Sequence, residues 1–181
     1  MQDLNYFDHL AEFSADLVNH VAVKYDDQTL LEDVLRDISA MQLGSNDTSA
    51  AKIIAEFLEK LSVTNPKLTL RHLSLIVTQL DSESHTLRMS VIQVIGNVIR
   101  HLATSEDRTD QTNTQLKSLF HVIEERFHDV NSFVRARLLN VLAELCRNHA
   151  LPITRRPKVM AMTVERVMDK SSTVRKKAVQ L

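Results

Sequence analysis

Three short stretches that resemble one another decide the fold of this chain. Residues 129–135 read Asp-Val-Asn-Ser-Phe-Val-Arg, residues 169–175 read Asp-Lys-Ser-Ser-Thr-Val-Arg, and residues 81–88 read Asp-Ser-Glu-Ser-His-Thr-Leu-Arg. Each runs from an aspartate through a short polar link to an apolar residue and an arginine. The aspartates stand 48 and then 40 residues apart. The chain therefore contains an internal repeat with a period near 40 residues.

Apolar residues around these stretches recur at the spacing of one helix face. The clearest case is 133–146, with Val134, Leu138, Val141, Leu142 and Leu145. The same spacing predicts helices over 3–23, 28–42, 48–62, 66–80, 84–103, 115–127 and 152–168. We expect Asn65 and Pro66 to open one helix, Pro152 to open another, and Gly44 to end a third. Sustained alternation of period two is absent from the sequence, so we predict no strands.

Two helices per period of about 40 residues are typical of HEAT repeats. The predicted fold is all-α, a HEAT-repeat α-solenoid or alpha-alpha superhelix. We expect an N-terminal helical segment with irregular repeats at 1–63 and HEAT repeats at 64–103, 114–149 and 150–181, with a polar inter-repeat loop at 104–113. The last repeat ends inside its second helix, and a solenoid needs a polar cap. The chain is therefore expected to belong to a longer array.

Each repeat offers residues that suit the turn between its two helices. Ser84, Ser132 and Ser172 are expected to cap the second helix. The aspartates and arginines are expected to pair within or between repeats and fix the stacking, with ligand contact by the arginines as the alternative reading. These structural candidates are Asp81, Arg88, Asp129, Arg135, Asp169 and Arg175.

Composition excludes several classes of protein. Apolar residues make up 44% of the 181 residues, which excludes wholesale disorder, and the two glycines and three prolines are too few for many tight hairpins. One cysteine, Cys146, allows no intrachain disulfide and fits a reducing compartment. The sequence contains no apolar run of the roughly 18 residues that span a bilayer, and its acidic start is unlike a secretory signal.

Charge is distributed unevenly along the chain. Residues 1–90 hold 7 Lys/Arg against 14 Asp/Glu, a net of −7, whereas residues 91–181 hold 15 against 9, a net of +6. A basic end suits binding to a nucleic-acid phosphate backbone, without recognition of base sequence, or to an acidic protein surface. The alternative is a basic face that is merely exposed to solvent. The candidate contact residues are Arg137, Arg155, Arg156, Lys158, Lys176 and Lys177. They are expected to form one ridge, because equivalent turns of stacked repeats line up.

The sequence predicts no catalytic, cofactor-binding or metal site. A phosphate-binding loop would need more glycines than Gly44 and Gly96. Cys146 and His149 lie one helical turn apart, but a structural zinc site needs four ligands and the sequence offers no second pair at suitable spacing. We therefore predict a protein that binds macromolecules and is not an enzyme, with no cofactor. A DNA glycosylase of helical-repeat fold is the enzymatic alternative, disfavoured by the lack of tryptophan.

The repeat stretches carry a family resemblance. The run from Leu80 to Asn97, the run His128-Asp-Val-Asn-Ser-Phe-Val-Arg-Ala-Arg-Leu-Leu and the residues 150–156 and 169–181 resemble the condensin complex subunit 1 family, the D2-type HEAT subunits. Residues 31–38 fit more loosely. The resemblance covers about residues 28–181, and the sequence from Asp129 to Arg135 is its most specific part.

The resemblance implies an internal portion of a large, non-catalytic scaffold subunit. Family members bind the kleisin subunit and the SMC ATPase subunits and act in mitotic chromosome condensation. The resemblance thus implies that the chain binds kleisin, SMC subunits and, without sequence specificity, DNA or chromatin. It implies a location in the nucleus, on chromosomes and also in the cytoplasm. It implies no membrane contact and no small-molecule substrate. The alternative is a HEAT module of another assembly: a nuclear transport receptor, a coat adaptor or another kleisin-associated protein.

Overall fold

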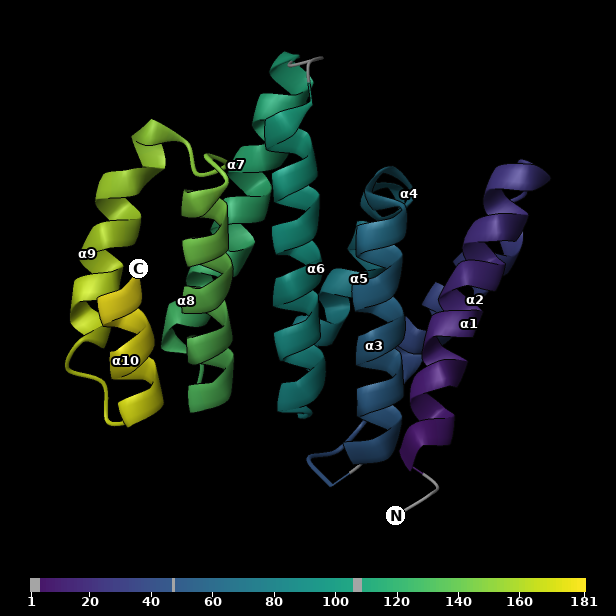
Figure 1. The fold of residues 1–181 in the computed structure, drawn as a ribbon, viewed down its shortest axis with the longest axis horizontal. Helices are drawn as coiled ribbons and strands as arrows, with labels where there is room; N and C mark the ends of the chain where they lie inside the picture. The colour runs from purple at the N-terminus through teal and green to yellow at the C-terminus, as the bar shows by residue number, and fades with distance from the viewer. Residues whose placement is uncertain (1–3, 47, 106–108) are drawn as a thin grey trace. The chain divides into compact units, whose positions relative to one another are not determined.

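The molecule is built from helices throughout the part that can be described. The computed structural model describes residues 4–46, 48–105 and 109–181, and the regular elements within these ranges are all helical, with no strand among them (Figure 1). The prediction of an all-α fold of solenoid class is confirmed. Among the described helices, none combines the length and the apolar character needed to cross a membrane.

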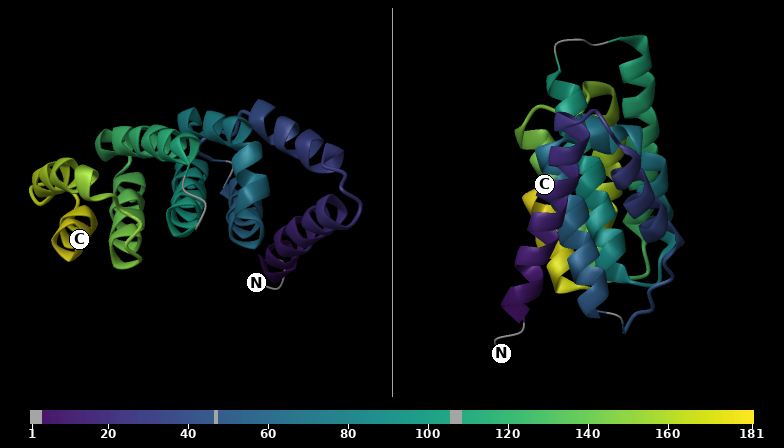
Figure 2. Two further views of the ribbon diagram at one scale, coloured as in Figure 1. Left: turned by 90° about the horizontal axis from the view of Figure 1, so that it is seen from above. Right: turned by 90° about the vertical axis from the view of Figure 1, so that its right-hand side faces the viewer.

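The chain divides into two compact units, residues 1–94 and residues 95–181. The first unit holds α1 (Leu4–Lys24), α2 (Thr29–Ala40), α3 (Thr48–Thr64), α4 (Pro66–Arg71), α5 (Leu73–Val77), the 3₁₀ turn η1 (Thr78–Asp81) and the first half of α6 (His85–Thr104). Within this unit α1 packs against α3, and α2 packs against α5 in a second layer (Figure 2). Helix α2 is amphipathic, because Leu31, Leu35 and Ile38 recur at helical spacing and are all buried.

Two helix ends in the first unit test the sequence predictions. Asn65 caps α4, since its side-chain oxygen accepts from the backbone N–H of Leu68 at 3.0 Å, and Pro66 is the first helical residue; both predictions are confirmed. The predicted helix 66–80 is interrupted at His72, where the backbone leaves the helical region.

Helix α2 ends earlier than predicted. Its last residue is Ala40, so Gly44 does not terminate it, which corrects the prediction. The amide of Gln79, a buried residue from the facing layer, donates to the backbone oxygen of Ile38 at 2.7 Å and reaches that of Met41 at 3.3 Å. A side chain distant in sequence thus satisfies carbonyl groups that a glycine turn would otherwise serve.

The second unit is also built from two layers of helices. It holds the rest of α6, α7 (Asp110–Glu124), the 3₁₀ turn η2 (Glu125–His128), α8 (Ser132–Arg147), the 3₁₀ turn η3 (Ile153–Arg155), α9 (Arg156–Arg166) and α10 (Ser172–Gln180). Within this unit α8 packs against α10 in one layer, and α7 and α9 lie in the other (Figure 2).

Two helices of the second unit begin at other residues than predicted. Helix α7 starts at Asp110, because the hydroxyl of Thr109 accepts from the backbone N–H of Thr112 at 3.2 Å, so the end of the predicted 104–113 loop is helical. Helix α9 starts at Arg156 with Pro157 in its first turn, and Pro152 precedes a 3₁₀ turn instead. A proline suits either place, which is why sequence alone did not choose correctly.

Helices α6 and α8 approach each other closely within the second unit. A Cβ added to Gly96 would collide with the side chain of Val141. Both positions lie in a well-packed interior, where Ile95, Val98 and Leu142 are completely buried. Gly96 is therefore needed for its lack of a side chain rather than for backbone freedom.

Candidate interaction surfaces

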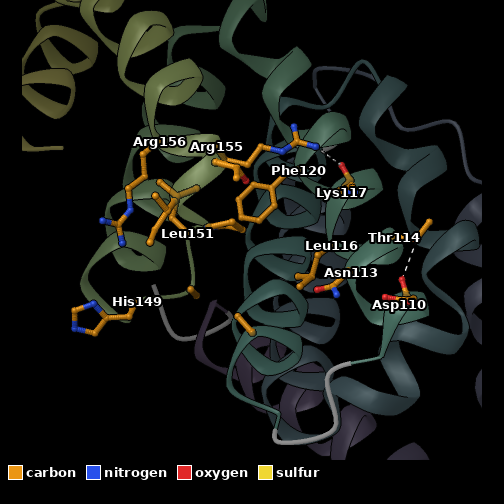
Figure 3. A pocket seen from close by; sticks show the side chains of 15 residues that line it. Asp110, Asn113, Thr114, Leu116, Lys117, Phe120, His149, Leu151, Arg155 and Arg156 are labelled. Atoms are coloured by element: carbon orange, nitrogen blue, oxygen red, sulfur yellow. Dashed lines mark hydrogen bonds between the residues drawn. The ribbon is translucent and has the colours of Figure 1, made fainter.

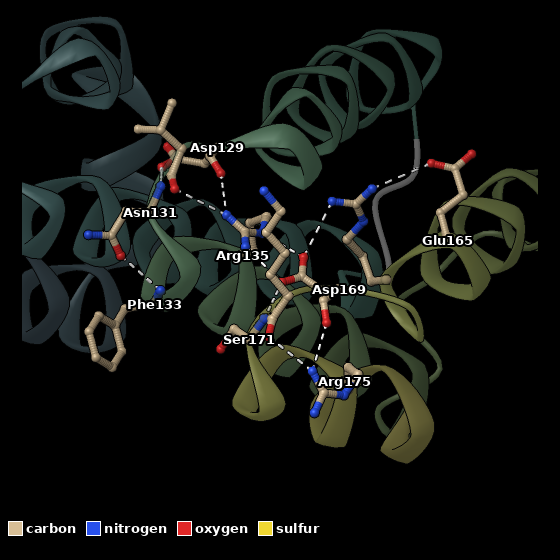
Figure 4. A network of polar contacts seen from close by, with 11 residues as sticks. Asp129, Asn131, Phe133, Arg135, Glu165, Asp169, Ser171 and Arg175 are labelled. Carbon is tan, nitrogen blue, oxygen red and sulfur yellow. Dashed lines mark hydrogen bonds and ion pairs between the residues drawn. The ribbon is translucent and has the colours of Figure 1, made fainter.

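The arginine of each repeat closes the turn that precedes its helix. The Nη1 atom of Arg135 donates to the backbone oxygens of Asp129 at 2.7 Å and Val130 at 3.2 Å. Arg175 repeats this with the carbonyls six and five residues upstream, at 2.8 Å and 3.0 Å. The aspartate side chain holds the same turn from inside, since Asp129 accepts from the backbone N–H of Asn131 at 2.8 Å (Figure 4).

The first repeat keeps this geometry with a different residue. Arg88 donates to the backbone oxygens of Ser82 at 2.7 Å and Glu83 at 3.1 Å. The Ser82 hydroxyl accepts from the backbone N–H of Ser84 at 3.2 Å, as the aspartates do in the other turns. Ser82 therefore occupies the aspartate position, and the assignment of Asp81 to it is corrected by one residue. The sequence gives the reason, because Arg88 lies seven residues after Asp81 whereas the other two arginines lie six after theirs.

At two of the three turns the helix cap is not the predicted serine, whereas Ser84 stands directly before the first residue of α6. Helix α8 is capped by Asn131, whose side-chain oxygen accepts from the backbone N–H of Phe133 at 2.8 Å, and Ser132 is already helical. Ser172 is likewise the first residue of α10, and Ser171 stands at the cap position without a side-chain capping bond. Asparagine and serine are both good capping residues, so their order in the sequence could not show which of the two caps α8.

One arginine also joins neighbouring repeats. Arg135 donates from Nε and Nη2 to the two carboxylate oxygens of Asp169, each at 2.8 Å. The side chains are 13% and 3% exposed, so water screens this pair little. The hydrogen bonds from Arg135 hold the pKa of the Asp169 carboxyl below its ordinary value against the opposing effect of burial. Two-pronged contact of this kind also fixes orientation, so the pair sets how α10 stacks on α8.

A second ion cluster lies at the opposite end of α9. Glu124, with a side chain only 2% exposed, accepts from Arg155 at 3.0 Å and 3.1 Å and from Lys158 at 2.6 Å. Arg155 also donates to the backbone oxygen of Lys117 at 3.1 Å and lies 5.9 Å from the centre of the Phe120 ring. Arg155 and Lys158 therefore neutralise a buried carboxylate within the molecule, a role that charge counting from sequence missed.

The predicted single basic ridge is corrected by this geometry. Arg155, Arg156 and Lys158 lie at the start of α9, whereas Lys176 and Lys177 lie in the middle and in the last turn of α10. Helix α9 runs between the two groups, and its 11 residues span about 16 Å. Arg137, in the first turns of α8, lies at the same end of the helices as the α10 group. The six candidates thus form two separate groups.

Sequence reasoning missed other residues at the turns. Lys170 is exposed beside the α10 group, and Val130 and Phe133 are 93% and 58% exposed at the start of α8. Their signal was present in the repeat alignment, because Lys170 and Val130 occupy the same variable position directly after the aspartate. Only the backbone oxygen at this position is used in the turn, so the side chain is left exposed.

The described residues hold no group of three or more potential metal ligands. Cys146 is partly buried, and this burial raises the pKa of its thiol. His149 is exposed just beyond the end of α8, at a positive φ of 54°.

Comparison with known proteins places the repeats in a family. The family model described as "Sister chromatid cohesion protein PDS5 protein" matches residues 8–181. The chain belongs to this PDS5 family. The match covers all three repeat turns described above, including the arginines that close them.

Individual relatives of this PDS5-family chain are condensin subunits. Condensin complex subunit 1 of Saccharomyces cerevisiae is 34% identical and that of Schizosaccharomyces pombe 33%, both over all of this chain, and the Homo sapiens protein is 29% identical over the same extent. The resemblance expected from the sequence is confirmed. The chain spans only 15%, 16% and 13% of these relatives' own lengths.

Proposed function

We propose that the chain is a non-catalytic HEAT-repeat scaffold segment of a condensin complex, acting in mitotic chromosome condensation. The observation that carries this proposal is the similarity to condensin complex subunit 1 along the whole chain. The family description speaks of sister chromatid cohesion, but the relatives at 33–34% identity carry the condensin name. The place of action that follows is the nucleus, on chromosomes, with a cytoplasmic pool.

The proposed partners are the kleisin subunit and the SMC ATPase subunits. Stacked repeats suit this task, because each repeat adds exposed turns to an extended binding surface while buried pairs such as Arg135–Asp169 keep the stack in register. ATP hydrolysis is assigned to the SMC partners, since a chain with two glycines has no phosphate-binding loop. Neither a cofactor nor a small-molecule substrate is part of the proposal.

Co-purification tests the scaffold role. The chain, carrying an affinity tag, is co-expressed with kleisin segments and SMC head segments of the same condensin complex, and stable retention of at least one of them is expected. The matched control is the kleisin of a cohesin complex, which we expect to be lost on washing. Retention of the cohesin kleisin with loss of both condensin partners would contradict the proposal and favour the alternative of another kleisin-associated assembly.

DNA contact is a second candidate function, supported by the charges around α10. Lys170 and Lys176 are exposed, Lys177 is half-buried beside them, and the first turn of α10 contains no acidic residue. Lys170 lies just before the positive N-terminal end of α10, where its charge opposes the helix dipole, and a bound phosphate would relieve this. We propose that this group, with Arg137, contacts the DNA backbone without reading bases.

Charge reversal distinguishes the two basic groups. The double variant Lys170→Glu/Lys176→Glu should weaken binding to duplex DNA and flatten the dependence of affinity on salt, because fewer counterions are released. The control is Arg156→Glu, exposed at the other end of α9, which should leave both quantities unchanged. Equal losses in the two variants would show that binding follows overall charge and would sink the assignment to α10.

A further inference from the structure

A groove in the second unit lies at the start of α9, away from the α10 lysines, which follow the other end of that helix. It is a cavity of about 960 Å³ between α7 and the segment 149–156 (Figure 3). This volume is at the upper end of the range found for ligand sites in proteins, about 300–1,000 Å³. None of the contacts proposed above uses it.

The floor of the groove is apolar. Leu116, Phe120 and Leu151 line it and are themselves buried, and Figure 3 shows the Phe120 ring and Leu151 side by side at its centre. Ile153, which lines the groove, is 76% exposed. An exposed isoleucine over an apolar floor offers a contact for one or two apolar side chains of a partner.

The rim of the groove is basic. Lys117 and Arg156 are exposed on different elements, and Arg155 lies between them above the Phe120 ring (Figure 3). Asp110 is the acidic member of the lining, and the exposed Lys117 and Arg156 together outweigh its charge. Arg155 is held by Glu124 and by the backbone oxygen of Lys117, and is therefore part of the wall. Lys117 and Arg156 are the cations placed to meet a ligand.

Shape decides which polyanion fits. A DNA backbone is a convex rod that meets exposed ridges and presents no apolar side chains. A concave site with an apolar floor and a cationic rim instead matches a peptide that carries carboxylates beside leucine or phenylalanine. The structure therefore favours a peptide at this groove and leaves DNA to the α10 lysines.

We infer that this groove is a docking site for an acidic peptide segment of a partner protein, with an apolar side chain against Ile153 and carboxylates on Lys117 and Arg156. This names a class of partner for the scaffold and rests on the proposed function only to that extent. The binding itself is a property of the chain alone.

Fluorescence anisotropy of the intact chain tests the inference. The probe is a short fluorescein-labelled peptide in which pairs of glutamates alternate with leucine and phenylalanine. A second probe replaces the leucines and phenylalanines by serine, and a third replaces the glutamates by lysine. Saturable binding of the first probe is expected, with affinity at least about tenfold weaker for the serine probe and none for the lysine probe.

Protein variants locate the binding. Lys117→Glu/Arg156→Glu and, separately, Ile153→Asp should each weaken the first probe about tenfold or more, whereas the matched control Lys170→Glu/Lys176→Glu should not. These positions are exposed, and circular dichroism should confirm unchanged helix content in every variant. Absence of saturable binding, or equal affinity in the groove and control variants, would overturn the inference. Failure here with successful co-purification would leave the scaffold proposal standing, and the reverse outcome would leave the groove standing.

Discussion

At the scale of single residues, Arg135 performs two tasks at once. It closes its own turn through two backbone carbonyls and reaches Asp169 in the next repeat through its remaining donors. The sequence showed that an aspartate and an arginine recur, and from this a pairing within or between repeats was expected. It could not show which donor serves which partner, because that depends on how α10 packs against α8.

Breaking this pair should be costly. Arg135→Ala removes one partner of a carboxylate that is 3% exposed, so we expect a loss of about 2 kcal/mol in the free energy of unfolding, measured by urea denaturation. Lys176→Ala, an exposed cation on α10, is the control and should change the value by less than about 0.5 kcal/mol. A similar effect of both variants would mean that the Arg135–Asp169 pair contributes no more to stability than an exposed positive charge does.

The pair also predicts how stability depends on pH. The pKa of Asp169 is lowered in the folded chain, so its contribution is present above the unfolded value of about 3.9 and is lost as pH falls through the folded value. The chain should therefore lose thermal stability as pH falls below about 4, and Asp169→Asn should show a shallower loss over that acidic range. An unchanged pH profile in the variant would contradict the assignment.

At the cap of α8 the structure and the sequence prediction name different residues: Asn131 in the structure, Ser132 in the prediction. Asn131→Ala should destabilise the chain by about 1 kcal/mol, because the backbone N–H of Phe133 loses its acceptor. Ser132→Ala should have little effect, since Ser132 lies inside the helix. Chemical denaturation of the two variants, side by side, gives the comparison, and a larger effect at Ser132 would restore the serine as the cap.

At the scale of elements, helices were predictable where one amphipathic pattern dictates them, and their ends were less so. The apolar spacing of 133–146 closely matches α8. The end of α2 was missed because its carbonyls are served by Gln79, about forty residues away in sequence. The candidate cluster at Arg155 and Lys158 was likewise seen as free charge, because the buried Glu124 that binds both lies on another helix.

The contact between α6 and α8 gives a prediction at this scale. Gly96→Ala would raise the helix propensity of α6, yet its methyl group would collide with Val141. We expect a net loss of about 1–3 kcal/mol in the free energy of unfolding. The double variant Gly96→Ala/Val141→Ala should recover part of it, because the smaller side chain makes room. A stabilised single variant would show that the helices move apart freely at this point.

At the scale of the whole molecule, the two units carry net charges of opposite sign. The first unit carries a net charge of −7 and the second +6. Repeat period and charge asymmetry could be predicted from sequence, because both are sums over many residues. The groove could not, since its floor and rim come from α7 and from the segment before α9, and only their packing in the second unit brings them together.

The central claim is that this chain is a binding scaffold of a condensin complex whose basic second unit carries the contacts. Cross-linking mass spectrometry of the assembled complex, using an amine-reactive reagent, tests it most directly. The account predicts cross-links from Lys117 to kleisin or SMC subunits, with their yield reduced when an acidic peptide competes, and a reduced yield of all cross-links from Lys170 and Lys176 when DNA is bound. A complex in which Lys117 cross-links only within the chain, while lysines of the first unit reach the other subunits, would contradict it.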